Sequence, residues 1–307
     1  MSLEFTHKYY IDTIPFAPSS RAIALGMFDG LHEGHMDVIR DTVRFAAANN
    51  LSSCVQTFVN LPKCGDGLIT TVEEQCDILS KAGVDEMIIL DYNEVCNLTP
   101  EEFVYDYLKV RLGADTCISG EDYRFGKGAS GDTEELKRIG SEFIMEVRTV
   151  PPRIINGRKI SSTWLKEALK AGHPDEFAAM CGGRRFRYTG RVAHGKGMGN
   201  KMGFPTANLE IPSDKIVARR GVYATRVKLG RDVYYGVTNI GLRPTMEDAV
   251  KDICETHILD FDEDIYGAEI CVELCEFLRD EQKFSSADEL IAAVDDNKKK
   301  ARELFGI

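Results

Sequence analysis

The chain has 307 residues, of which 43% are hydrophobic and 28% charged, and its formal net charge is −11. Such a composition is typical of a globular protein with two domains of ordinary size. The negative charge argues against a general nucleic-acid binder, which presents a basic face. The sequence contains no apolar run of the roughly 20 residues that cross a membrane and no signal-peptide core. Its nine cysteines form no C-x-x-C pair, so we expect a cytoplasmic protein with free thiols and no membrane partner.

Strands and helices are expected to alternate in the first half of the chain. Apolar runs predict strands near 22–28, 53–58, 86–90, 114–119 and 143–150, and periodic patterns predict helices near 36–48, 72–82, 100–112 and 133–139. Thr71-Val72-Glu73-Glu74 and Thr99-Pro100-Glu101-Glu102 are capping boxes, and Asn156-Gly157 predicts a hairpin. The alternation predicts a parallel sheet covered on both faces, which binds ligands beyond the carboxyl ends of its strands.

A glycine-rich loop, Gly26-Met27-Phe28-Asp29-Gly30-Leu31-His32-Glu33-Gly34-His35, joins the first predicted strand to the first helix. Glycines let the backbone approach a ligand, and the following helix N-terminus offers free N–H groups. The loop is neither a Walker A motif nor a dinucleotide fingerprint. We interpret it as a phosphate site at which His32 and His35, with a reference pKa of about 6.5, donate hydrogen bonds. The alternative is a pair of histidines in an exposed turn.

Two further clusters in the first half can bind ligands. In Gly120–Gly128, Tyr123 and Phe125 can stack on a flat ring and Arg124 can reach a phosphate. The alternative for this cluster is a glycine-rich loop with a solvated arginine. The hydroxyls and N–H groups of Ser161-Ser162-Thr163 can bind ATP phosphates, or can simply cap a helix.

The second half changes character near a linker-like stretch, 172–185, so we predict domains at 1–182 and 183–307. Short alternating stretches at 186–192, 221–229, 233–239, 253–261 and 269–277 predict a small antiparallel barrel. Apolar residues with helical spacing predict a last helix from Ala287 to Leu304.

The barrel half carries two candidate groups of site residues. Gly195, Gly197, Gly199 and Gly203 allow a loop to wrap a polyphosphate, after which Thr206 and Asn208 offer neutral oxygen ligands to Mg²⁺. The alternative is a flexible loop followed by an edge strand. Glu255 shares a strand face with His257 and is either a general base for a substrate hydroxyl or a paired structural carboxylate.

Taken together, these strings resemble the prokaryotic bifunctional riboflavin kinase/FAD synthetase family over about residues 15–305. The kinase strings are Gly203-Phe204-Pro205-Thr206-Ala207-Asn208, Gly221-Val222-Tyr223, Asn239-Ile240-Gly241-Leu242-Arg243-Pro244-Thr245, Glu255-Thr256-His257 and Phe277-Leu278-Arg279. The resemblance implies an α/β chain with an N-terminal Rossmann-like nucleotidyltransferase domain, built on a parallel sheet, that converts FMN to FAD. It also implies a C-terminal six-stranded antiparallel β-barrel with a C-terminal helix that phosphorylates riboflavin to FMN.

The resemblance and the motifs together give a set of expected site residues. Catalytic roles are expected for Glu255, His32 and His35, and flavin binding for Asp122, Arg124, Phe125 and Arg279. ATP and phosphate binding is expected for Gly26, Phe28, Asp29, Gly34, Ser161, Ser162, Thr163, Gly195, Gly197, Gly199, Gly203 and Pro205. Thr206 and Asn208 are the expected Mg²⁺ ligands. The expected partners are riboflavin, FMN, ATP as co-substrate and, through weak self-association, a second copy of the chain, but no nucleic acid.

The first domain departs from the family pattern at two places. Leu61 stands where the family usually has histidine in Phe-x-Pro-His-Pro, and Trp164 and Lys166 replace the two arginines of Ser-Ser-Thr-Arg-Ile-Arg. A lysine keeps the charge but not the planar fork that grips phosphate. These departures motivate an alternative, a riboflavin kinase whose first domain is catalytically weakened or inactive. A second alternative is a flavin- or nucleotide-binding regulator without turnover.

Overall fold

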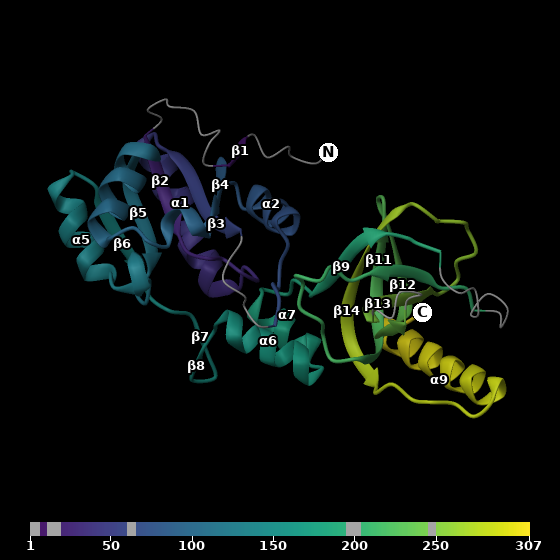
Figure 1. Cartoon of the computed structure of the whole chain (residues 1–307). Coiled ribbons are helices and arrows are strands. Elements are labelled where there is room, and N and C mark those ends of the chain that lie inside the picture. Colours follow the sequence, from purple (N-terminus) through teal and green to yellow (C-terminus); the bar gives the residue numbers. More distant parts are fainter. Residues whose placement is uncertain (1–6, 11–19, 60–65, 195–203, 245–249) are drawn as a thin grey trace. The chain divides into compact units, whose positions relative to one another are not determined.

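The computed structural model describes residues 7–10, 20–59, 66–194, 204–244 and 250–307. The chain divides into two units, Met1–Ser162 and Thr163–Ile307, and each is described by itself (Figure 1). No helix among the described residues has the length and apolar character of a membrane span.

The first unit is built on a six-stranded, all-parallel sheet with the strand order β1-β4-β3-β2-β5-β6. Its strands are β1 (His7–Tyr10), β2 (Arg21–Leu25), β3 (Ser52–Val59), β4 (Glu86–Asp91), β5 (Ala114–Gly120) and β6 (Glu146–Val150). The five predicted strands are confirmed, and β1 was not predicted. Because all the strands are parallel, their carboxyl ends meet at one edge of the sheet.

Helices cover both faces of this sheet, as predicted (Figure 1). They are α1 (Glu33–Asn49), α2 (Val72–Lys81), α3 (Tyr92–Val95), α4 (Pro100–Glu102), the π-helical segment η2 (Phe103–Arg111), the single turn η3 (Lys127–Ala129) and α5 (Thr133–Glu142). Helices α1 and α2 pack in one apolar core, whereas η2 and α5 pack in the core on the opposite face. Both predicted capping boxes are present, at Thr71 and Thr99.

A two-stranded hairpin follows the parallel sheet. It consists of β7 (Ile154–Ile155) and β8 (Arg158–Lys159), joined by the two residues predicted to form the turn. Asn156 and Gly157 have φ values of 50° and 77°, which is the backbone that a two-residue type I′ turn requires. The turn therefore fixes the register of the hairpin.

The second unit contains an antiparallel sheet with the order β10-β13-β12-β11-β14-β9. Its strands are β9 (Arg187–Arg191), β10 (Ala207–Glu210), β11 (Gly221–Leu229), β12 (Asp232–Pro244), β13 (Val250–Ile258) and β14 (Glu269–Arg279). A bridge between Ala193 and Asn208 brings the two outer strands together, so the sheet is a nearly closed barrel. The C-terminal helix α9 (Ala287–Phe305) packs on its outer face, next to Val222 and Val237 (Figure 1). The predicted fold class is confirmed.

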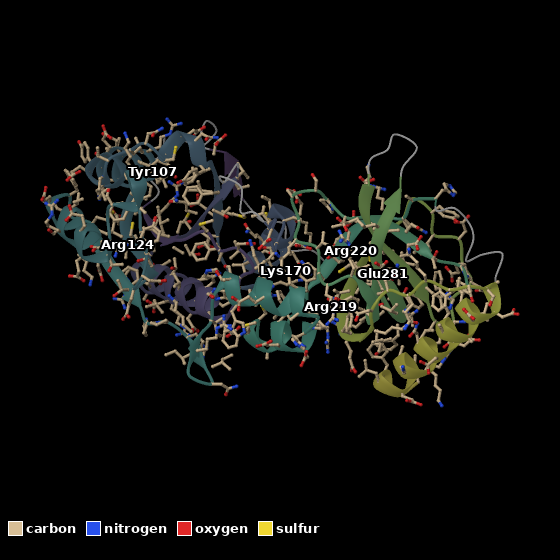
Figure 2. The ribbon with its side chains drawn as sticks, turned by 60° about the horizontal axis from the view of Figure 1, so that its bottom comes forward. Tyr107, Arg124, Lys170, Arg219, Arg220 and Glu281 are labelled. Carbon is tan, nitrogen blue, oxygen red and sulfur yellow. The ribbon has the colours of Figure 1, made fainter. Side chains whose placement is uncertain are left out.

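Two further helices, α6 (Ser162–Ala171) and α7 (Pro174–Met180), group with the barrel. Arg219 holds α6 there: its N–H donates to the carbonyl of Leu169 at 2.9 Å, and its guanidinium donates to the carbonyl of Ala171 at 3.1 Å (Figure 2). The guanidinium also lies 4.6 Å from the ring centroid of Phe277. The two compact units divide after Ser162, whereas the sequence predicted a domain boundary after residue 182. The boundary at residue 182 stays a prediction.

Candidate active sites

The first unit contains a cavity of about 550 Å³ at the carboxyl ends of β2 to β6, where a parallel sheet binds ligands. Its wall is formed by the loops that follow these strands and by the hairpin. Its polar and charged side chains include those of His32, His35, Asp122, Arg124, Arg153, Lys159, Ser161 and Ser162. Most of these residues were predicted from the sequence, but Arg153 and Lys159 were not.

The loop after β2 has an unusual backbone. Phe28, Gly30 and Leu31 have φ values of 51°, 82° and 44°, although only glycine adopts this region without strain. Phe28 and Leu31 are buried in the core under α1, and this burial holds the strained backbone in place. A Cβ on Gly26 would lie 2.9 Å from the Phe28 ring, so glycine is required there as well.

Asp29 anchors this loop to the segment at Ile69 and Thr70 and does not line the cavity. Its carboxylate is only 5% exposed and accepts hydrogen bonds from the N–H groups of Ile69 (2.8 Å) and Thr70 (3.2 Å). The Thr70 hydroxyl accepts from the N–H of Gly30, and the Ser162 hydroxyl donates to the carbonyl of Asp29. The geometry therefore favours an anchoring role for Asp29 over the expected contact with ATP.

The two histidines lie in the cavity wall with their rings stacked 3.7 Å apart. Nδ1 of His32 accepts a hydrogen bond from the N–H of His35 at 3.2 Å and so caps helix α1. An accepting Nδ1 carries no proton, so this bond assigns a neutral ring with its hydrogen on Nε2. His32 therefore presents one N–H donor at the start of α1, where the helix dipole also favours an anion.

The loop after β5 supplies one carboxylate and one cation to the cavity. Asp122 forms an ion pair with Lys159 of the hairpin. Arg124, which is labelled in Figure 2, forms one with Asp132 at 3.5 Å. Burial by itself raises the pKa of Asp122, but the bond and charge of Lys159 outweigh burial, so the pKa is lowered.

Aromatic side chains form an apolar part of the same wall. Phe125 is 4% exposed and packs 5.3 Å from the ring of Phe103, and it lies parallel to the ring of Tyr123 at 6.0 Å. Phe58 and Tyr92, at the ends of β3 and β4, form an edge-to-face pair in the same cavity. A flat ring can pack against these faces. The sequence reasoning did not single out Phe58, Tyr92 or Phe103. Phe58 lies in β3 and the other two follow β4, so they come together because β3 and β4 are neighbouring strands.

In the barrel, residues from five strands lie on one register row, and three of them are candidates predicted from the sequence. Asn208 on β10 pairs with Glu255 on β13, and Glu255 pairs with Asn239 on β12. Asn239 pairs with Val222 on β11, which in turn pairs with Arg279 on β14. Directly paired residues point to the same face of a sheet, so these side chains share the outer face on which α9 packs.

Asn208 is the most buried polar member of this row, at 4% exposure. Its Nδ2 donates to the carbonyl of Thr206 at 3.1 Å, whereas its Oδ1 has no hydrogen-bond partner among the residues that the structure describes. A buried amide oxygen without a hydrogen-bond partner is a strong candidate to coordinate a cation or to accept a hydrogen bond from a substrate.

Helix α9 positions the other end of the row. Nε of Arg279 donates to Oδ1 of Asn297 at 3.3 Å, and its guanidinium lies 5.6 Å from the ring centroid of Phe284. Burial lowers the pKa of Arg279. Asn297 is itself 1% exposed, so the arginine is held in a defined orientation.

The barrel unit also contains a cavity of about 420 Å³, whose wall does not include Asn208, Glu255 or Arg279. Pro205, Thr206, Ala207 and Thr256 contribute to its wall, together with the segment 261–266. Nδ1 of His257 lies 2.9 Å from the carbonyl oxygen of Pro205 and fixes the start of β10. A carbonyl oxygen only accepts, so Nδ1 carries the hydrogen of this bond, and burial lowers the pKa of His257.

Comparison with known proteins identifies both units. A family model described as FAD synthetase matches residues 15–164, and one described as riboflavin kinase matches residues 182–305. A bifunctional riboflavin kinase/FMN adenylyltransferase from Listeria monocytogenes is 32% identical to the chain, with 96% of each covered, and one from Escherichia coli K12 is 33% identical, with 93% of each covered. The chain belongs to this bifunctional family. The expected family is thereby confirmed.

A solved structure resembles the chain over nearly its whole length. This Streptococcus pneumoniae protein, named as a macrolide-efflux protein, is 30% identical, with a TM-score of 0.85, and the match covers 96% of this chain and 98% of that one. Its name applies to that protein alone. Both family matches agree with the two cavities, since one lies in each matched region.

The FAD synthetase unit brings most of its predicted site residues together. Those in its cavity wall are Gly26, Phe28, His32, Gly34, His35, Asp122, Arg124, Phe125, Ser161 and Ser162. Thr163 is exposed and does not line this wall. Leu61 lies outside the described residues.

The riboflavin kinase unit brings Asn208, Glu255 and Arg279 onto one row and bonds Asn208 to Thr206. Gly195, Gly197, Gly199 and Gly203 lie outside the described residues. The sequence reasoning missed Asn239 and Asn297 as candidates. Asn239 belongs to a string that carries the family resemblance, which is the signal that could have found it.

Trp164, at a position where the resemblance leads us to expect arginine, is a well-packed residue. Its side chain is 8% exposed, and its Nε1–H donates to Oε1 of Glu176 on α7 at 2.8 Å. The indole is therefore packed and hydrogen-bonded between α6 and α7. It supplies no positive charge for a phosphate.

Proposed function

We propose that the barrel unit phosphorylates riboflavin to FMN with ATP and that the parallel-sheet unit converts FMN to FAD with a second ATP, releasing pyrophosphate. The observation that carries the first activity is the register row, which brings Asn208, Glu255 and Arg279 together from three strands. The second activity is supported by the cavity in which the histidine loop, the aromatic wall and several cations meet.

In the kinase reaction, Glu255 acts as the general base. Its carboxylate accepts the proton of the ribityl 5′-hydroxyl as that oxygen attacks the γ-phosphorus of ATP, and ADP leaves. Arg279 lies on the same row and contacts the flavin substrate, held in place by Asn297. Positioning and charge stabilisation supply most of the rate enhancement in such transfers.

Mg²⁺ is proposed as the metal of the kinase site. The residues fit it, because the Oδ1 of Asn208 is buried without a hydrogen-bond partner among the described residues, and the hydroxyl of Thr206 lies beside the Asn208 amide. Neutral oxygens together with substrate phosphates are typical Mg²⁺ ligands. When bound, the ion would neutralise charge on the ATP phosphates.

In the adenylyl transfer, a phosphate oxygen of FMN attacks the α-phosphorus of ATP and pyrophosphate leaves. The Nε2–H of His32 donates to an oxygen of the α-phosphate, where negative charge builds in the transition state, and His35 lies beside it. The flavin ring packs against the aromatic wall around Phe125, with Asp122 and Arg124 near its polar groups. Ser161 and Ser162 bind the ATP phosphates.

A time course tests both activities. The purified chain is incubated with Mg²⁺, ATP and either riboflavin or FMN, and the flavins are separated by chromatography. We expect FMN first and then FAD from riboflavin, and FAD directly from FMN. Accumulation of FMN without FAD would support the kinase-only alternative, and absence of FMN would overturn the kinase assignment. The expectations of a cytoplasmic location, of weak self-association and of no nucleic-acid or membrane partner stay predictions from the sequence.

A further inference from the structure

The hairpin after the parallel sheet contributes cations to the FAD synthetase cavity that neither motif nor family match assigns. Arg153 and Lys159 line the cavity together with Arg124. Among the described residues, these three cations share the cavity wall with the carboxylate of Asp122. Each of the three cations is paired with a carboxylate, Lys159 with Asp122, Arg124 with Asp132 and Arg153 with Asp37, so a cation of this wall binds an anion by exchanging its partner.

The geometry of the hairpin fixes the position of Lys159. The type I′ turn sets the register, so Lys159 pairs with Ile154 across the two strands. Directly after it, the N–H of Ile160 donates to the carbonyl of Arg153 at 3.0 Å, and the Ile160 side chain is 1% exposed. Lys159 therefore lines the cavity directly before the buried Ile160 and two residues before Ser161.

Arg153 holds this hairpin to helix α1 through ion pairs. Its Nε lies 2.9 Å from a carboxylate oxygen of Asp37, and its Nη2 lies 3.6 Å from one of Glu33. Its Cβ lies 3.7 Å from the position that a Cβ on Gly34 would occupy. Arg153 is therefore a positioning residue that places the hairpin beside the histidine loop.

Lys159 is held more weakly. Its ion-pair partner is the Asp122 carboxylate, whose side chain is 72% exposed, and exposed pairs of this kind contribute little. An ATP triphosphate in the cavity carries several negative charges and competes readily for the ammonium group. We propose that Lys159 binds the triphosphate of ATP in the adenylyl-transfer site, exchanging Asp122 for phosphate oxygens. The proposal rests on the proposed FAD synthetase activity. It gives the hairpin a cation that binds phosphate, in a chain that has Trp164 where the resemblance leads us to expect arginine.

The test uses full-length variants and steady-state FAD formation from FMN and Mg-ATP. Lys159→Ala should raise the KM for ATP by about tenfold and leave the KM for FMN within about twofold, because a charge-assisted contact to ATP is lost. Lys159→Arg, which keeps the charge, should restore most of the affinity. The matched control is Arg158→Ala, which removes the same charge from the adjacent position, on the other side of the same strand, and should leave both constants unchanged.

A second background separates ligand binding from a structural ion pair. If Lys159 served only to pair with Asp122, Lys159→Ala would have no effect in an Asp122→Asn chain. We expect the same loss of ATP affinity in that background. FMN formation by the kinase unit of the same molecules is expected to stay constant and reports the concentration of intact protein. An unchanged temperature at which FAD formation is lost reports that the FAD synthetase unit of each variant is folded.

The outcomes separate a failure of the proposed FAD synthetase activity from a failure of the role of Lys159 alone. A wild-type chain that makes no FAD overturns the proposed FAD synthetase activity and the role of Lys159 with it. If the wild type makes FAD, an effect that vanishes in the Asp122→Asn background, an equal effect of Arg158→Ala, or a rise confined to the KM for FMN overturns the role of Lys159 alone.

Discussion

The two candidate sites of this chain are built in different ways. In the FAD synthetase unit, site residues lie on loops beyond the ends of parallel strands, and hydrogen bonds outside the sheet hold them, as Asp29 does with the N–H groups of Ile69 and Thr70. In the kinase unit, Asn208, Glu255 and Arg279 lie within the strands, on one row of the ladder. A substitution can therefore change one loop of the first site without moving the rest, whereas the residues of the kinase site are held in place by the pairing register of the strands.

The largest effect is expected at the centre of the row. Glu255→Gln keeps the shape of the side chain but removes the base, so FMN formation should fall by about 10²- to 10⁴-fold while riboflavin still binds. Turnover measured with riboflavin and Mg-ATP checks this. Glu276→Gln, at an exposed position on β14, is the matched control, and FAD formation from FMN on the same molecules should not change. Unchanged FMN formation would remove Glu255 from the base role.

The next effect tests the loop site. His32→Asn keeps an acceptor that can cap α1 but removes the Nε2–H donor, so FAD formation should fall by about ten- to a hundredfold. FMN formation is the internal reference. His32→Ala should lose the same activity and in addition about 1 kcal/mol of stability, because the cap is also removed. Equal activity of His32→Asn and wild type would contradict the donor role.

A smaller effect separates the two sites by their metal dependence. Asn208→Ala removes the buried oxygen proposed as a Mg²⁺ ligand, so the Mg²⁺ concentration for half-maximal FMN formation should rise about tenfold. Glu210→Ala, at an exposed position on the same strand, is the control. The Mg²⁺ dependence of FAD formation should stay as in the wild type. A fall in FMN formation that extra Mg²⁺ does not relieve would argue against metal ligation.

The smallest effect concerns the anchor under the loop. Asp29→Ala leaves the N–H groups of Ile69 and Thr70 buried without their acceptor, at a cost of about 1–3 kcal/mol. The temperature at which FAD formation is lost should fall by a few degrees, at about 2–4 °C per kcal/mol. The temperature at which FMN formation is lost should stay the same. An unshifted temperature for FAD formation would contradict the anchoring role.

The sequence by itself determined the features that depend on short-range chemistry. The capping boxes at Thr71 and Thr99 and the turn at Asn156-Gly157 were predictable, because each is set by residues within a few positions of one another. The alternation of strands and helices, the barrel and the histidine loop followed from local patterns in the same way. The four-residue strand β1 was missed, since it is defined only by its pairing with β4.

Tertiary structure decided which of these residues meet. Asn239 joins Asn208 and Glu255 only through the register of three strands, a relation that no local pattern encodes. Lys159 reaches the cavity of the histidine loop because the hairpin folds back beside α1, more than a hundred positions later in the chain. Asp29 stands in the middle of the phosphate motif, yet burial and two backbone N–H groups turn it away from the cavity. Contacts between distant segments, which depend on packing rather than on neighbours in sequence, thus completed both sites.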